Sequence, residues 1–185
     1  MNDYGKYARV ERERKFLLRD LPEPLTRMSE HVQMWDSYIT GTRLRLRRVR
    51  WPQTKKQVWK LTQKFAPDAE DLSRTVITNI YLSEYEYEVL SVFEGNEIRK
   101  NRYPFEYEGR AYSIDLFIGP LWGLVLAETD FENDEELDSF KLPPFAVEDV
   151  TNDQLFTGAR LSGLIFADLK KEYGRRKDSK SLEQS

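Results

Sequence analysis

The chain has 185 residues, the size of one domain that can bury a full apolar core without disulfides. It contains no cysteine and one histidine, which excludes thiol catalysis and makes cysteine- or histidine-rich zinc sites untenable. The net charge of −3, from 29 basic and 32 acidic residues, argues against a nucleic-acid partner. No apolar run reaches the length of a membrane span and no signal-peptide core is visible, so we expect a soluble, cytoplasmic protein without a membrane partner.

The first half of the chain is dominated by strand patterns. A strand is predicted over Val10–Leu18, and apolar residues at every third or fourth position then predict a helix over Pro22–Met34. Strict alternation predicts strands over Thr42–Arg50 and Gln57–Phe65, and β-branched residues predict another over Arg74–Leu82.

The second half mixes strands with short helices. Ser83 and Glu86 form a capping-box pattern that opens a predicted helix over Glu84–Glu94. The further predicted elements are a hairpin of Ile98–Glu106 and Arg110–Phe117 turned at Glu108-Gly109, a strand over Leu121–Phe131, a helix over Asn133–Phe140, and a helical region from Thr151 to about Tyr173.

This order of elements predicts an α+β domain over residues 1–173, followed by a polar, mobile tail over residues 174–185. Most connections join strand to strand, which is typical of an antiparallel sheet or a closed antiparallel β-barrel with helices outside. Strand–helix alternation and a glycine-rich phosphate loop are both missing, so a doubly wound nucleotide-binding fold is not supported.

Charged residues follow strand spacing, which places charges of one sign on one face of each strand. Residues 41–64 contain nine basic residues and no acid, whereas residues 128–153 contain ten acids and one lysine. Like charges at positions i and i+2 lie about 7 Å apart and repel by roughly 2 kcal/mol at an effective dielectric of 20. Such faces are suited to bind a group of opposite charge. Arg43, Arg45 and Arg47 would face an anion. Glu11 with Glu13, and Glu128 with Asp130, would face a cation. A metal–polyphosphate complex satisfies both, and an all-oxygen donor set favours Mg²⁺ or Mn²⁺.

Seven ordered segments resemble the motifs of the CYTH family, the triphosphate tunnel metalloenzymes. The Glu11-x-Glu13-x-Lys15 segment is similar to the family's opening E-x-E-x-K strand. The other similar segments are Arg43-x-Arg45, Leu61-Thr62-x-Lys64, Lys100-x-Arg102-Tyr103, Ile114-Asp115, Leu126-Ala127-Glu128-x-Asp130 and Asp149-Val150-Thr151-x-Asp153.

The resemblance implies a closed antiparallel barrel of about eight strands that forms a charged tunnel, with Mg²⁺ or Mn²⁺ as cofactor. It also implies that Asp115 orients a basic residue. Lys60 lies on the same strand face as Lys64, so we add it to the expected phosphate ligands. The implied metal ligands are Glu11, Glu13, Glu128 and Asp130. The implied phosphate ligands are Lys15, Arg43, Arg45, Lys60, Lys64, Lys100 and Arg102, of which Lys15, Lys64 and Arg102 form the catalytic set.

Three departures from the family pattern stand out. Val76 and Thr78 are interpreted as occupying positions where the family's strand carries carboxylates. Asp130 is one methylene shorter than the glutamate of the pattern. The late tyrosine–asparagine pattern is replaced by residues 156–158, and Arg160 is the residue expected to supply a basic contact from the C-terminal helix.

The leading hypothesis is metal-dependent hydrolysis of a small-molecule triphosphate, inorganic or organic. One alternative is an adenylate cyclase of the class IV type on the same scaffold. Another is a non-catalytic polyphosphate- or nucleotide-binding protein, and RNA binding by the basic ribbon over residues 43–64 is disfavoured by the net charge. A homodimer is left open.

Overall fold

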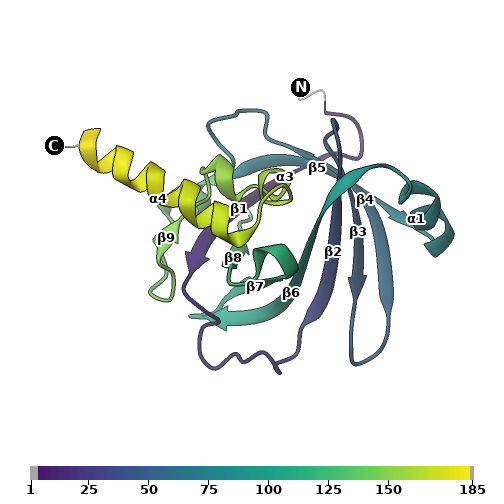
Figure 1. Ribbon diagram of the computed structural model, residues 1–185, viewed down its shortest axis with the longest axis horizontal. Coiled ribbons are helices and arrows are strands. Elements are labelled where there is room, and N and C mark those ends of the chain that lie inside the picture. Colours follow the sequence, from purple (N-terminus) through teal and green to yellow (C-terminus); the bar gives the residue numbers. More distant parts are fainter. Residues whose placement is uncertain (1–3, 184–185) are drawn as a thin grey trace.

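The computed structural model describes residues 4–183, which form nine strands and six helical segments (Figure 1). The strands are β1 (Arg9–Leu18), β2 (Val32–Ile39), β3 (Leu44–Arg50), β4 (Gln57–Phe65), β5 (Arg74–Leu82), β6 (Gly95–Tyr107), β7 (Arg110–Ile118), β8 (Val125–Asp130) and β9 (Glu148–Asp149). The helical segments are α1 (Glu84–Leu90), η1 (Gly119–Leu121), α2 (Asp134–Ser139), η2 (Gln154–Phe156), α3 (Gly158–Leu161) and α4 (Phe166–Glu183).

Eight strands close into an antiparallel barrel. Their order is β5-β4-β3-β2-β6-β7-β8-β1, and pairing of β1 with β5 completes the ring. The first strand divides its length between two partners: its first half pairs with β5 and its second half with β8, so that Glu13 lies opposite Asp130. The short β9 is added beside β1. The predicted α+β fold with a barrel of about eight strands is therefore confirmed.

Local sequence signals account for several element ends. Ser83 and Glu86 form the predicted capping box at the start of α1, and Asn133 caps α2. The hairpin of β6 and β7 turns at Glu108 and Gly109, whose φ angles are 50° and 75°. A two-residue turn with positive φ at both positions matches the twist of the flanking strands, which explains the Glu-Gly pair.

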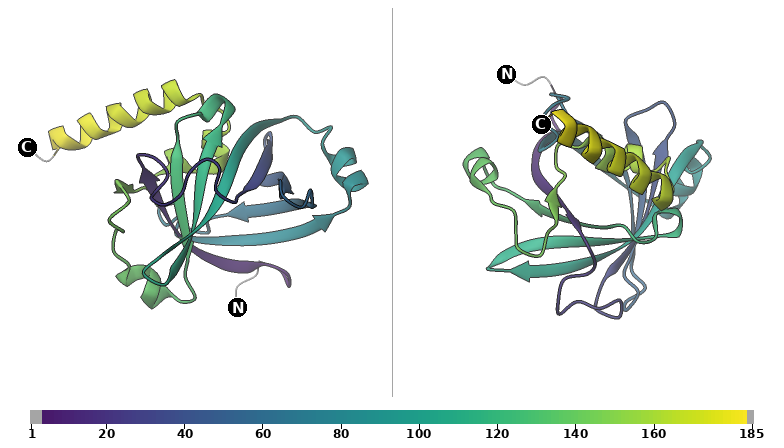
Figure 2. Two further views of the ribbon diagram at one scale, coloured as in Figure 1. Left: turned by 90° about the horizontal axis from the view of Figure 1, so that it is seen from below. Right: turned by 60° about the vertical axis from the view of Figure 1, so that its left-hand side comes forward.

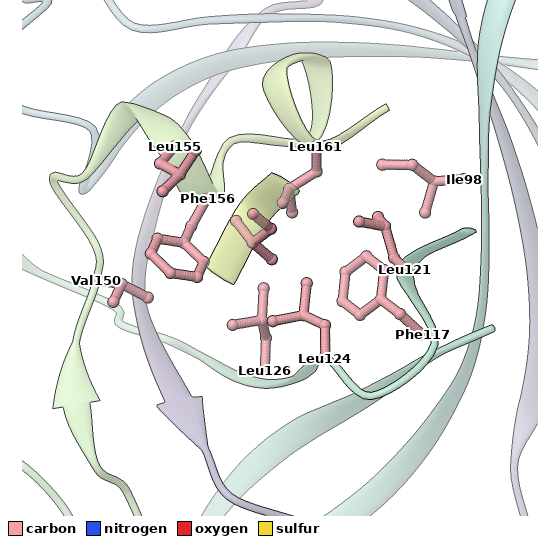
Figure 3. Close-up of a cluster of buried hydrophobic side chains, with 10 residues drawn as sticks. Ile98, Phe117, Leu121, Leu124, Leu126, Val150, Leu155, Phe156 and Leu161 are labelled. Carbon is pink, nitrogen blue, oxygen red and sulfur yellow. The ribbon is translucent and has the colours of Figure 1, made fainter. Parts of the chain in front are cut away.

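The C-terminal segments fill one part of the barrel with apolar side chains (Figure 3). Leu155 and Phe156 of η2 and Leu161 of α3 pack against side chains from the barrel wall, among them Leu126 of β8 and Ile98 of β6. We call this cluster the apolar plug. It joins the last third of the chain to the barrel and leaves the charged part of the interior beside it.

The main error in the predicted elements is the helix over Pro22–Met34. Residues 19–31 form turns and bends instead, and β2 begins at Val32. The apolar spacing imitated a helix, but Pro22 and Pro24 restrict the backbone of this stretch. The strand over residues 32–39 was missed because a buried acid, Asp36, stands where alternation would call for an apolar residue.

The remaining differences concern lengths. Helix α1 ends at Leu90, Gly95 begins β6 rather than following a helix, and β8 covers only the second half of the predicted Leu121–Phe131 strand. The tail expected from Gly174 onward continues α4 as far as Glu183, and Arg176 and Lys177 form ion pairs with acids of the domain. Helix α4 extends away from the barrel on the side opposite α1 (Figure 2). None of the described helices is long and apolar enough to cross a membrane.

Candidate functional site

A cavity of about 730 Å³ occupies the charged part of the barrel. Every strand from β1 to β8 contributes to its wall, and residues of η2 and α3 close it on the side of the apolar plug. The acidic residues of the wall are Glu11, Glu13, Asp36 and Glu128. The basic ones are Arg9, Lys15, Arg43, Arg45, Arg47, Lys60, Lys64, Lys100 and Arg102. Nine cations against four anions give a positive lumen in a protein whose net charge is negative.

The alternating charges of β1 place three groups in the lumen. Glu11, Glu13 and Lys15 all line the cavity, as their spacing predicted. Lys64 of β4 reaches across, with its Nζ 2.6 Å from Glu11 Oε2 and 3.8 Å from Glu13 Oε1. Lys15 Nζ lies 3.3 Å from Glu128 Oε1 on β8. The first and eighth strands thus bring acids and lysines together at the seam of the barrel.

These close charges move the pKa values of the lumen in opposite directions. Burial and the neighbouring Glu128 raise the pKa of Glu13. Burial acts to raise the pKa of Glu128 as well, but Arg102 and Lys15 outweigh it and hold that pKa well below its usual range. Burial acts to lower the pKa of Lys64, whereas Glu13 and Glu11 prevail and raise it. Burial acts in the same way on Lys15, and Glu128 and Glu13 likewise prevail and raise its pKa, so both lysines stay charged at neutral pH.

A buried carboxylate holds the basic pair of β6. Asp115 of β7 is fully buried and receives hydrogen bonds from Lys100 and from Arg102, whose Nη2 lies 2.6 Å from Asp115 Oδ2. Arg102 also bonds to Glu128. Burial lowers the pKa of Lys100, against the opposing effect of Asp115. These contacts agree with the predicted role of Asp115 in orienting a basic residue, and that role stays a prediction.

The basic pair of β3 has a similar partner that the sequence interpretation missed. Asp36 of β2, only 1% exposed, accepts two hydrogen bonds from Arg47, and both residues line the cavity with Arg45. The Nε of Arg45 is buried without a hydrogen-bond partner. The spacing of Arg43, Arg45 and Arg47 had already placed Arg47 on the anion-facing side, although the motif resemblance retained only the first two.

Two further basic residues of the wall, Arg43 and Lys60, contact aromatic rings. Arg43 is exposed and its guanidinium stacks over Phe65, 4.4 Å from the ring centre. Lys60 lies 4.9 Å from the ring centre of Tyr81. Both line the cavity, as predicted, and their charges remain available to an anion.

Three predicted residues lie outside the cavity wall: Asp115, which lies behind Lys100 and Arg102, Asp130 and Arg160. Asp130 is exposed at the end of β8. Burial, followed by the charges of Glu11 and Glu128, raises the pKa of Asp130. Arg160 is not among the residues that line the cavity and pairs with Glu172 of α4 at 2.8 Å, so the structure does not bring it into the tunnel as predicted.

The interpretation of Val76 and Thr78 is also corrected. Neither residue lines the cavity, because the inward positions of β5 are Thr75, Ile77 and Asn79. All three side chains are neutral, so β5 presents no carboxylate to the lumen, as expected. The inward-facing positions, however, are shifted by one residue from the predicted positions.

The four predicted metal ligands fit a hard divalent cation in their chemistry, because carboxylate oxygens suit Mg²⁺ and Mn²⁺. Burial, and then repulsion from neighbouring acids, raise the pKa values of Glu13 and Asp130, and a cation would relieve that repulsion. Among the side chains that the structure describes, no three acidic or histidine residues converge into a metal site. Instead Glu11 is paired with Lys64, and Glu128 with Lys15 and Arg102.

Comparisons with known proteins agree with this geometry. The inorganic triphosphatase of Acetivibrio thermocellus is 35% identical over 94 residues, which cover 45% of this chain and 58% of that protein. The inorganic triphosphatase of Nitrosomonas europaea is 31% identical over 70 residues, 37% of this chain and 46% of the relative. The chain thus spans about half the length of the curated relatives it matches. No protein-family model matches it.

Solved structures share the fold. The inorganic triphosphatase NE1496 superposes with a TM-score of 0.55 at 22% identity, over 82% of this chain and 93% of the other. A candidate adenylate cyclase from Bacillus halodurans gives a TM-score of 0.50 at 12% identity, over 80% of this chain and the whole of the other.

Fold and lumen together define a closed β-barrel whose interior carries the charges expected for a bound polyanion. The partial sequence matches to two inorganic triphosphatases agree with the resemblance to the CYTH family that the ordered motifs indicated, and the solved structures share the barrel fold.

Proposed function

We propose that the protein hydrolyses a triphosphate in a reaction that depends on a divalent metal ion. The observation that carries this proposal is the excess of cations in a cavity that also gathers carboxylates at one seam. The named activity of the similar proteins supports it. Five of the nine basic residues of the ribbon line the lumen, namely Arg43, Arg45, Arg47, Lys60 and Lys64, which leaves fewer than half of them for RNA on the outer surface.

The basic side chains of the lumen bind and orient the phosphate chain. Lys15, Lys64 and Arg102 lie beside the acids of the seam, and their positive charges offset the charge that develops on the phosphoryl oxygens. A Mg²⁺ or Mn²⁺ ion held by Glu11, Glu13, Glu128 and Asp130 would add Lewis-acid neutralisation at those oxygens.

The chemistry is an in-line displacement at the terminal phosphorus. The oxygen of a water molecule forms a bond to that phosphorus, the bridging P–O bond breaks, and the proton lost from water passes to solvent. For inorganic triphosphate the products are orthophosphate and diphosphate. No covalent nucleophile is required, which agrees with the absence of cysteine from the sequence.

The test is phosphate release from inorganic triphosphate, thiamine triphosphate and ATP, each with Mg²⁺, Mn²⁺ or EDTA. We expect metal-dependent release that falls by about 100- to 1,000-fold in Glu13→Gln, the order of effect that loss of one electrostatic group has in a closed site. Glu97→Gln removes an exposed acid of β6 and serves as the matched control.

Other outcomes decide against the hydrolase. Cyclic AMP formation from ATP would establish the cyclase alternative. Binding of triphosphate without release of phosphate under any of the metal conditions would establish a binding protein.

A further inference from the structure

Two buried carboxylates of the barrel have the same relation to basic residues that line the lumen. Asp115 lies under Lys100 and Arg102 of β6, and Asp36 lies under Arg45 and Arg47 of β3. In each case the basic residues occupy positions i and i+2 of one strand, and the acid comes from the neighbouring strand. The role of Asp36 is not explained by the assigned phosphate or metal ligands.

The contact between Asp36 and Arg47 fixes the guanidinium at two points. Arg47 Nε lies 2.5 Å from Asp36 Oδ1 and Arg47 Nη2 lies 2.7 Å from Asp36 Oδ2. The two residues are also direct partners in the β2–β3 register. Because a fork-shaped contact restricts rotation of the guanidinium plane, the edge carrying Nη1 is left to face another acceptor.

Arg45, in contrast to Arg47, forms no hydrogen bond from its Nε to Asp36. Its Nε is 3.9 Å from Asp36 Oδ1, beyond hydrogen-bond distance, and it is buried without a partner. A buried donor without a partner is unfavourable unless a ligand supplies the acceptor. The Arg45 side chain lines the cavity, so an anion in the lumen is placed to supply that acceptor.

The electrostatic effect of Asp36 opposes its positioning effect. Its negative charge lies among Arg47, Arg45 and Lys100, and it weakens the attraction of this wall for an anion. An acid in a phosphate-binding wall reduces the affinity of that wall for the anion. The geometry compensates for this, because Asp36 fixes the orientation of Arg47 and leaves the Nε donor of Arg45 unpaired.

We propose that Asp36 is a positioning residue for the phosphate chain, which holds Arg47 in one orientation and leaves Arg45 Nε as the open donor toward the bound anion. The kinetic part of this inference rests on the proposed hydrolysis, whereas the binding part needs only that the lumen takes a triphosphate.

The test uses the full chain as wild type, Asp36→Asn, Asp36→Glu and the control Glu97→Gln. Calorimetry with inorganic triphosphate in EDTA measures binding without turnover, and phosphate release with Mg²⁺ gives kcat and KM. Loss of the charge in Asp36→Asn is expected to tighten binding in EDTA by about tenfold, since one repulsive charge is removed. Its kcat is expected to fall by about 10- to 100-fold, because an arginine displaced by about 1 Å holds the phosphate chain out of line.

A purely structural role predicts another pattern. Asp36→Asn would then bind no more tightly than wild type, and kcat would follow the loss of folded protein measured by circular dichroism; that result overturns the proposal. Recovery of part of kcat in Asp36→Glu, without tighter binding, supports it. If Asp36→Asn does not fold, Arg47→Lys keeps the charge and removes the two-point contact, and an unchanged kcat in that variant overturns the proposal.

The two proposals fail separately. Absence of turnover by wild type under every metal condition contradicts the hydrolase, and the binding arm in EDTA still decides the role of Asp36. Normal turnover in wild type with no tightening in Asp36→Asn contradicts the role of Asp36 alone.

Discussion

Substitution of Asp115 by asparagine is expected to destabilise the barrel strongly. The Arg102–Asp115 contact of 2.6 Å corresponds to a gross attraction of about 6 kcal/mol at an effective dielectric of 20. Desolvation offsets part of that attraction, and removal of one partner from a buried ion pair costs about 3–5 kcal/mol in measured cases. Lys100 loses its partner as well, so two basic side chains are left without the buried acid.

The expected loss of about 3–5 kcal/mol should lower Tm by roughly 6–20 °C in a domain of this size. Urea unfolding and thermal melts, followed by circular dichroism, measure it. The control Glu97→Gln disrupts the Arg99–Glu97 pair, whose side chains are 53% and 45% exposed, and its expected loss is below about 1 kcal/mol. Equal stability of Asp115→Asn and the control would refute the view that a buried acid holds the basic pair.

Two further predictions concern stability. In Gly158→Ala the new Cβ would lie 1.8 Å from Tyr38 Oη, so we expect a lower Tm. In Gly174→Ala, within α4, the added methyl group has no atom within 4 Å and should raise stability by about 0.5–1 kcal/mol. Equal melting temperatures of the two variants would contradict this. Arg47 and Arg45 outweigh burial and lower the pKa of Asp36 in the folded protein below its ordinary value of 3.8, so its contribution to stability is complete above that value and is lost as the pH falls through the folded pKa. The difference in unfolding free energy between wild type and Asp36→Asn should therefore shrink between pH 6 and pH 2, and a constant difference would contradict the assigned ion pair.

Strand periodicity was enough to place most of the lumen charges. In a strand the side chains at i and i+2 share a face whatever the tertiary structure, so Glu11, Glu13 and Lys15 could be assigned to one wall. The barrel then brings Lys64 and Glu128 to them through cross-strand pairing, which no single segment reveals.

The errors have physical causes of the same kind. Asp36 was missed because it interrupts the apolar alternation of its strand. A buried acid at such a position is stable only beside arginines from another strand, which the segment itself does not reveal. Val76 was assigned inward because the register of β5 against β1 decides which parity faces the lumen. Arg160 was assigned to the tunnel because the position of α4, which supplies Glu172, depends on packing beyond its own segment.

The pairing of residue 13 with residue 130 has a consequence for folding. The candidate site lies on the seam where the first strand meets the eighth, so its acids and lysines meet only when the ring closes. Such contacts between distant parts of a chain form late and slowly, because a long loop must be ordered before they stabilise anything. Hairpins such as β6–β7 are local and can form earlier. A refolding chain therefore gains most of its secondary structure before it can hold a polyanion, and the return of triphosphate binding marks ring closure.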